Sequence, residues 1–461
     1  MHWQTGHRAC LAEGYSCTLE RNTPLLLKAC VTPYACRLTM GIMLPKRQWF
    51  PSDLWRTFRY HCPYALSKAP VLAGIGLASF IAVKSLGASG WLVALLASSG
   101  PLGNLLGGVW GGRVAAGRKT DYVLAAETLS NLALLLVFFA RSALSFSLLI
   151  ALAQLARSPV TSALTSIWRA NYPGTLRNRI LGWIEQRVLL IAAGLSVLLG
   201  NLLEIDPFAY RWVFPLMGIL SQIGCLWFRG LTVHDHHVGR PTPVLRGWSV
   251  LLKRPEFARY ELNFFLHGTA NLMVIASLPL FLEQQLNFDY RQASFVLVLA
   301  PNLLGMAFMG FWGRLLDRQN PLVVRLWLNC IWLISPLLLA HAHGFLEVAV
   351  ARAAQGLILG GVLLVWRLGV NYYAHCDEVA VYMGVHQALT GLRGVIAPYL
   401  GIALGQAIGY RVTFLVAFIL GVLATIVIGI EIILEKKKRG LPTYMEAEES
   451  NRTFLPPSPD S

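Results

Sequence analysis

Apolar stretches, each of about 20 residues, recur through most of this chain, from about residue 69 to residue 434. A stretch of that length crosses the hydrocarbon core of a bilayer as a helix. The composition agrees, because only 13% of the 461 residues are charged, whereas soluble domains carry about 25%. Closed barrels, the other structure that lipid permits, need short alternating strands, and none are visible. The sequence therefore predicts an all-α polytopic membrane protein.

Hydropathy predicts twelve transmembrane helices. They cover residues 70–86, 90–110, 122–140, 144–168, 184–203, 209–228, 261–283, 291–312, 322–342, 345–367, 384–408 and 411–434. The domains that follow are a poorly structured N-terminal extension (1–45), an interfacial cytoplasmic segment (46–69), an N-terminal six-helix half (70–228), a cytoplasmic linker (229–260), a C-terminal six-helix half (261–434) and a cytoplasmic tail (435–461). The interfacial segment contains aromatic residues beside arginines, a pattern typical of a helix lying along the membrane surface.

The net charge of +16 is unevenly distributed. Basic residues gather in the segments on one side of the predicted helices, as in "EKKKRG" at 435–440, while each loop on the other side holds about one. The positive-inside rule then puts both termini in the cytoplasm, with the protein in the plasma (inner) membrane. The positive charge is a topology signal, so no nucleic-acid partner is expected.

Cysteines and histidines give no metal pattern. Four of the eight cysteines fall within residues 1–36, at spacings that fit no common zinc site. The histidine-rich tracts at 231–241 and 341–343 lack cysteine or acidic partners at ligand spacing. We expect no metal and no cofactor.

Several phrases occur twice in the chain, in the same order. "NLLG" at 104–107 returns at 302–305, each time shortly before Trp-Gly, and "IWRANY" at 167–172 has a counterpart in "VWRLGVNYY" at 365–373. "GWIEQ" at 182–186 likewise matches "GVHQ" at 384–387. Because the matches keep the same order and nearly the same separation along the chain, they indicate two homologous halves.

These features resemble the major facilitator superfamily, whose members have twelve helices in two halves and a signature loop after the second helix of each half. The family phrase Gly-x-x-x-Asp-Arg-x-Gly-Arg-Lys is similar to "GRLLDRQN" at 313–320, while the first copy has Val114 in place of the Asp. "ARAAQGLILGG" at 351–361 is similar to the Arg-x-x-Gln-Gly phrase of the family, although the family has it in the fourth helix and this chain in the tenth. The resemblance implies a transporter fold over about residues 50–434.

The resemblance also implies a gate. Its candidate residues are Gly117, Arg118 and Lys119 in the first loop and Gly313, Arg314, Asp317 and Arg318 in the second. Asp317 is expected to act as a cytoplasmic latch that pairs with the segment 177–182, although these charges can equally serve topology alone. Glycine stripes at positions 103, 107 and 111 and at 401, 405 and 409 are expected to let the second and eleventh helices approach closely.

Ionisable residues inside predicted helices are the candidates for substrate binding, because each is costly in lipid. Gln154 and Arg157 in the fourth helix align with Arg352 and Gln355 in the tenth, so a Gln–Arg pair occurs in both halves with its order swapped. Arg393 lies in the eleventh helix. A pair of symmetry-related guanidiniums would attract an anionic solute. The alternative is that each arginine pairs internally and stabilises the bundle.

The seventh helix carries Asn263, His267 and Asn271 at a spacing of four residues. Such a polar stripe should face the pore rather than lipid. His267 can couple protons to transport or be a hydrogen-bonded structural histidine. Glu127, Glu185 and Glu261 are interpreted as acids at helix ends that complement the helix dipole.

The sequence favours a secondary active transporter that moves a small anionic or neutral solute by alternating access, as a monomer in the lipid bilayer. This prediction leaves open whether a proton or another ion is coupled to transport. No catalytic set and no nucleotide-binding loop are found, so an enzyme and an ATP-driven pump are disfavoured. Alternatives are a multidrug or lipophilic-cation efflux pump of the same fold and a transport-inactive receptor or scaffold.

Overall fold

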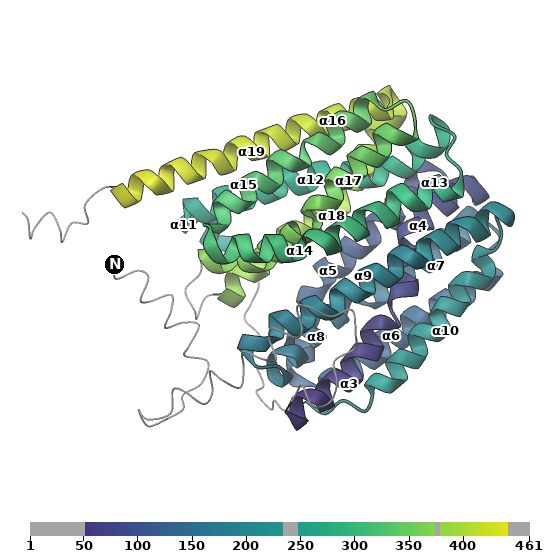
Figure 1. Cartoon of the computed structure of the whole chain (residues 1–461), viewed down its shortest axis with the longest axis horizontal. Helices are drawn as coiled ribbons and strands as arrows, with labels where there is room; N and C mark the ends of the chain where they lie inside the picture. Colours follow the sequence, from purple (N-terminus) through teal and green to yellow (C-terminus); the bar gives the residue numbers. More distant parts are fainter. Residues whose placement is uncertain (1–50, 234–247, 374–378, 441–461) are drawn as a thin grey trace, which may run out of the picture.

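The computed structural model describes residues 51–233, 248–373 and 379–440. Every regular element in these ranges is helical, and the helices pack side by side into a bundle (Figure 1). The predicted all-α class is therefore confirmed. The predicted N-terminal extension, most of the histidine-rich tract at 231–241 and most of the C-terminal tail lie outside the described residues.

The helices follow one another with short connections. The first group is α3 (Ser52–Leu66), α4 (Ala69–Leu86), α5 (Gly90–Ala116), α6 (Lys119–Leu136), η2 (Val137–Phe139), α7 (Ala143–Ala156), α8 (Ser158–Asn171), α9 (Gly174–Ile205) and α10 (Tyr210–Phe228). The second is α11 (Ser249–Lys253), α12 (Pro255–Gln284), α13 (Tyr290–Ser294), the π-helical turn η4 (Phe295–Leu299), α14 (Ala300–Arg318), α15 (Pro321–Trp332), α16 (Ile334–His341), α17 (Phe345–Leu368), η5 (Val370–Tyr372), α18 (Val379–Ile408) and α19 (Tyr410–Gly440).

Eleven helical stretches in the described ranges are long and apolar enough to cross a membrane. A shorter apolar helical stretch, Gly90–Leu106 in α5, accompanies them. Several expected spans consist of two joined helices, such as α7 with α8 and α15 with α16. The chain is thus a multi-pass membrane protein.

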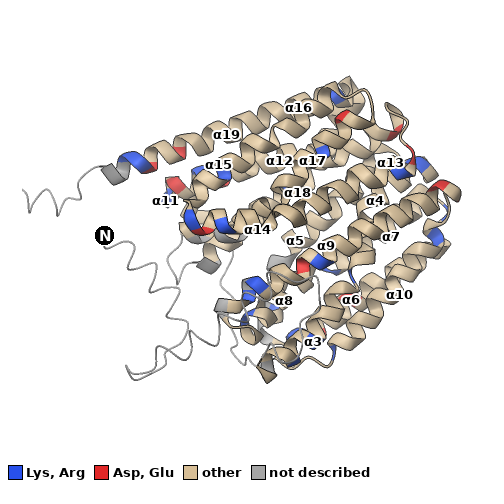
Figure 2. Ribbon diagram, in the orientation of Figure 1, with Lys and Arg blue, Asp and Glu red and all other residues tan. Residues whose placement is uncertain are grey.

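The two groups of helices occupy different sides of the bundle. In Figure 1, α3 to α10 lie below and α12 to α19 above. They meet where α5 packs against α18 and where α9 packs against α13, η4 and α14. Lysine and arginine are concentrated toward the end of the bundle where α3 begins and α19 ends (Figure 2).

Prolines divide two of the membrane spans at a basic residue. Proline lacks an N–H and its ring clashes with the carbonyl four residues earlier, so a helix tends to stop just before it. Pro70 follows the joint between α3 and α4, where Lys68 stands, and Pro159 follows the joint between α7 and α8, where Arg157 stands. The same local rule therefore places both cations at breaks in membrane-spanning helices.

The segment expected to lie along the membrane surface has a different position in the structure. Its residues from Ser52 onward form α3, which continues into α4 as one span and packs against α9 and α10. His61 is buried, stacks on Trp168 with ring centroids 3.7 Å apart, and meets the Tyr172 hydroxyl at 3.1 Å. Trp168 and Tyr172 give the His61 ring its partners inside the bundle, while Arg56 and Arg59 of α3 stay exposed.

Small residues allow the close approach of α5 and α18. A Cβ atom on Gly391 would lie 2.7 Å from the Leu105 Cβ, and one on Gly394 would overlap Pro101. The expected stripe on α18 faces elsewhere, since Gly401 packs against Met273 of α12. Close packing of these two helices is therefore present, but different glycines produce it.

Candidate functional site

A buried carboxylate joins three helices of the N-terminal group. Glu127 of α6 is 1% exposed, and its Oε2 lies 2.9 Å from the Lys68 Nζ. The Tyr64 hydroxyl donates to Oε1 at 2.9 Å, and the Arg157 Nε lies 3.4 Å from the same oxygen. We call Glu127, Lys68, Tyr64 and Arg157 the Glu127 cluster. Glu127 is therefore not the acid at a helix end that was expected, because it lies in the third turn of α6 with two cations around it.

Hydrogen bonds continue from the Glu127 cluster toward α10. Lys68 also donates to the Ser221 hydroxyl at 2.8 Å, and Ser221 in turn donates to the Asn131 side chain at 2.7 Å. Asn131 lies one helical turn after Glu127 on α6. The chain of donors and acceptors satisfies the polar groups of Lys68, as burial requires.

Arg157 is the most exposed charged member of the Glu127 cluster. Its side chain is 35% exposed, against 1% for Glu127 and 11% for Lys68. Gln154, one turn earlier, donates instead to the Leu96 carbonyl of α5 at 3.3 Å. The fourth-helix pair predicted from the sequence is thus divided, with Gln154 bonded to a neighbouring helix and Arg157 only partly covered.

Arg352 is enclosed within the C-terminal group. Its Nε donates to the Val296 carbonyl at 2.9 Å, and its other nitrogens bond the Leu297 carbonyl and the Gln355 side chain. Val296 and Leu297 belong to the π-helical turn η4, in which the regular helical bonds are displaced. Arg352 and Arg157, the arginines of the two related Gln–Arg pairs, therefore differ in their surroundings.

The polar stripe of α12 faces the interior of the C-terminal group, where other helices of the same group supply its partners. The Asn271 Oδ1 accepts from the Trp332 Nε1 at 3.0 Å and from the Gln355 Nε2 at 2.8 Å. His267 is 5% exposed and lies against the Trp332 ring with centroids 4.7 Å apart. The structure thus brings Asn271, Gln355 and Arg352 into one connected chain.

Arg325 of α15 is a buried charge that the sequence reasoning missed. It is 1% exposed, its Nε donates to the Asn263 Oδ1 at 3.0 Å, and its guanidinium carbon lies 3.9 Å from the centre of the Phe264 ring. Arg393 of α18, a predicted candidate, donates to the Phe264 carbonyl. The signal for Arg325 was present, because a lone arginine within an expected span is costly in lipid.

Glu261 was also assigned to a helix end, and the structure buries it. It is 2% exposed, and both of its carboxylate oxygens lie within 3.0 Å of the His386 Nδ1. His386 is completely buried. Two titratable residues on α12 and α18 therefore form a pair that the helix-dipole interpretation did not predict.

The predicted gate residues stand at the basic end of the bundle. Gly117 is the residue after α5, and Arg118 lies 3.7 Å from Asp121, both side chains being largely exposed. The second set occupies the last turns of α14, where Arg314, Asp317 and Arg318 are exposed. Among the described residues, no ion pair joins Asp317 to the segment 177–182.

The two helical groups are linked by polar contacts at the opposite end. The Lys84 Nζ donates to the Phe288 carbonyl at 2.7 Å, and the Ser85 hydroxyl bonds the Tyr290 hydroxyl. The backbone N–H of Tyr290 donates to Glu204 at 2.9 Å. We call Lys84, Ser85, Glu204, Phe288 and Tyr290 the distal contact, meaning the end far from the gate residues.

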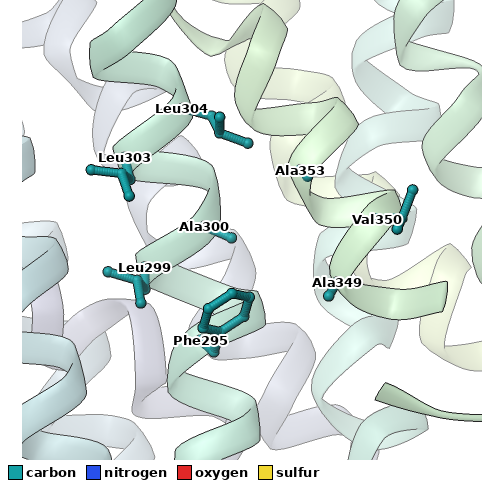
Figure 3. Close-up of a pocket in the computed structure, with 8 residues that line it drawn as sticks. All are labelled: Phe295, Leu299, Ala300, Leu303, Leu304, Ala349, Val350 and Ala353. Atoms are coloured by element: carbon teal, nitrogen blue, oxygen red, sulfur yellow. The ribbon is translucent and has the colours of Figure 1, made fainter. Parts of the chain in front are cut away.

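An apolar pocket of about 320 Å³ lies between α14 and α17 (Figure 3). Its lining residues are Phe295, Leu299, Ala300, Leu303, Leu304, Ala349, Val350 and Ala353. These side chains offer no hydrogen-bonding group, and none is a predicted site residue. The pocket therefore lacks the polar groups that would orient a polar solute.

Comparison with known proteins agrees with this architecture. The family model of the Major Facilitator Superfamily matches residues 71–328 and 262–453. Solved structures of the nucleoside transporter NupG and of a point mutant of it are similar, each at 13% sequence identity. The mutant structure has a TM-score of 0.66 and an alignment over 82% of this chain and 99% of its own, and the other has 0.64 over 84% and 100%. No curated protein matches this sequence.

Proposed function

The chain belongs to the major facilitator superfamily, and on that premise we propose that it moves a small anionic or neutral solute by alternating access of its two helical halves. Membership makes it a membrane transporter with a small-molecule substrate and not an enzyme. The proposal concerns the class of solute, the residues that bind it and the way the halves move.

The exposure of Arg157 carries the proposal. A guanidinium in the middle of a membrane-spanning region is costly in lipid, so its exposed part should face a polar cavity. Glu127 holds one edge of the guanidinium and leaves other N–H groups for a ligand, and these match a carboxylate or another acceptor. Arg157 would therefore bind the solute, with Glu127 orienting it.

The contacts at the two ends of the bundle fit alternating access. The distal contact closes one end of the bundle, while Asp317 at the other end has no ion pair among the described residues. If the basic end faces the cytoplasm, in agreement with the positive-inside rule, this arrangement is a state closed to the outside. In the opposite state we expect Asp317 to form the latch and the distal contact to separate. We place the protein in the plasma (inner) membrane as a monomer, with an ion or proton as a candidate for coupling.

Ligand-induced thermal stabilisation of the purified protein tests the solute class. The panel would contain organic anions, sugars, amino acids, nucleosides and lipophilic cations, and nucleosides are included as neutral solutes because a nucleoside transporter has a similar fold. Arg157→Gln would be compared with the parent and with Arg352→Gln, whose guanidinium contacts η4. We expect an anionic or neutral class to stabilise the parent and Arg352→Gln, and Arg157→Gln to lose that shift.

Other results would contradict the proposal in recognisable ways. Stabilisation by lipophilic cations alone would favour a drug-efflux pump of the same fold. If the ligand still raises the Tm of Arg157→Gln as much as that of the parent, the role of this arginine is structural. No shift by any class, together with no transport of the same compounds by proteoliposomes, would favour the receptor or scaffold.

A further inference from the structure

Two arginines lie buried in the C-terminal half without a carboxylate beside either guanidinium. Arg325 is 1% exposed and Arg393 9%. None of the ion pairs between described residues includes them, and both terminal nitrogens of Arg325 and the Nε of Arg393 lack a hydrogen-bond partner there. Arginine stays charged inside proteins, so its burial must be compensated by another group.

The unpaired donors converge on one turn of α12. Arg325 lies over the face of the Phe264 ring, while Arg393 reaches the carbonyl of the same residue from the other neighbouring helix. Gly268 makes room for the Arg393 guanidinium, because a Cβ at that position would overlap it. His267 lies between Phe264 and Gly268 in sequence, and its buried Nδ1 also lacks a hydrogen-bond partner among the described residues. Donors from α12, α15 and α18 thus surround a common region.

The available carboxylate does not neutralise this region. Glu261 is near enough to act on both arginines electrostatically, but its two oxygens are bonded to His386. Counted together, the two guanidiniums and this one carboxylate leave an excess of one positive charge. The Glu127 cluster differs, because there the carboxylate contacts its two cations directly.

We propose that the C-terminal half binds one small monovalent inorganic anion, such as chloride or nitrate, between Arg325, Arg393 and His267. Such an anion would accept from the unpaired N–H groups and cancel the excess charge. Burial of the surrounding residues favours an ion over a larger organic acid. The site is separate from Arg157 in the other half, so it does not depend on the solute proposed above.

Thermal unfolding of the purified protein without added solute tests the site. The parent would be studied at constant ionic strength while sodium gluconate is replaced by chloride, nitrate or phosphate. Binding stabilises the folded protein according to ligand concentration and affinity. We expect a saturable rise in Tm of a few degrees with chloride and nitrate and a smaller rise with phosphate, whose second charge is not matched.

Variants separate binding from a general salt effect. Arg325→Gln and Arg393→Gln should lose the anion-dependent rise, whereas Arg229→Gln, at an exposed position, should keep it. In gluconate, Arg325→Gln should be at least as stable as the parent, because it removes an uncompensated buried charge. The matched gluconate measurement shows whether each variant folds.

Three results would overturn the proposal. The first is a parent Tm that is independent of the anion. The second is an anion effect of equal size in Arg325→Gln, Arg393→Gln and Arg229→Gln, which would indicate a bulk salt effect. The third is stabilisation through Arg325 by organic acids but not by chloride or nitrate, which would assign the guanidiniums to the solute itself.

Discussion

The Glu127 carboxylate and the Lys68 ammonium are 2.9 Å apart and almost fully buried, although 59 residues separate them in the chain. Their pairing connects α6 to the joint between α3 and α4, and Arg157 connects the same carboxylate to the joint between α7 and α8. One acidic side chain thereby compensates the charge at two helix breaks. Removing one member of a buried pair leaves the other without compensation.

Glu127→Gln should therefore destabilise the protein strongly. The loss expected from breaking a buried pair is about 3–5 kcal/mol. Thermal unfolding in detergent would measure it as a lowered apparent Tm. Asp317→Asn is the matched control, because this acid is exposed and unpaired among the described residues, and its Tm should equal that of the parent. Equal Tm values for Glu127→Gln and Asp317→Asn would contradict a stabilising role for the cluster.

The arginines of the two Gln–Arg pairs should differ in their effect on stability. Arg352→Gln removes donors from the Val296 and Leu297 carbonyls, at a cost of about 1–3 kcal/mol if they remain unsatisfied. Arg157→Gln should cost less, since Glu127 keeps Lys68 and Tyr64 as partners. Unfolding of the two variants side by side would compare them. A larger loss for Arg157→Gln would mean that its ion pair, and not solute binding, is its main role.

Tyr290→Phe should shift the protein toward a form that is open at the distal contact. The substitution removes the hydroxyl that bonds Ser85 across the two halves. A lost hydrogen bond of about 1 kcal/mol changes the ratio of two states about fivefold. Spin labels at positions 144 and 346, both exposed and in different halves, would report the change as a larger population of long distances in a cysteine-free background.

Tyr210→Phe controls for the loss of a buried tyrosine hydroxyl. The Tyr210 hydroxyl donates to the Ala140 carbonyl within the N-terminal half. Its removal should leave the distance distribution unchanged. The same distribution for the parent and Tyr290→Phe would show that the Ser85–Tyr290 bond does not hold the halves together.

Gly394→Ala should disturb the contact between α5 and α18. The added Cβ would overlap Pro101, and overpacking of this kind costs about 1–3 kcal/mol. Gly384→Ala on the same helix meets no atom within 4 Å and should stabilise the helix by up to about 1 kcal/mol. Opposite shifts in Tm would support the contact, while a harmless Gly394→Ala would show that the two helices can separate without loss.

The membrane spans were predictable because a long apolar run has few alternatives in lipid. The repeated phrases and the loop at 313–320 likewise indicated the family before the helices were seen. The helix joints before Pro70 and Pro159 agree with proline chemistry, although Pro101, Pro215 and Pro279 lie inside unbroken helices. The sequence predicts those features of the fold that are determined by residues close together in the chain.

The polar clusters were harder to predict because their partners are distant in sequence. Glu127 and Glu261 each fall near the beginning of a span predicted from hydropathy, where an acid usually complements the helix dipole. Only the packing of other helices shows that they are paired. Arg325 belongs to no recognised phrase, so the family resemblance gave no reason to select it. The surface-lying prediction for α3 failed for a similar reason, since His61 finds its partner Tyr172 far along the chain.

The distance in sequence between Lys68 and Glu127 has a consequence for biosynthesis. The first span is made and meets the membrane before α6 exists, so its ammonium has no carboxylate at that stage. Insertion of a lysine at the centre of a helix costs about 2.5–3.5 kcal/mol on translocon scales. We therefore expect the nascent first span to be only marginally stable in the membrane until the third span emerges from the ribosome and supplies the Glu127 carboxylate.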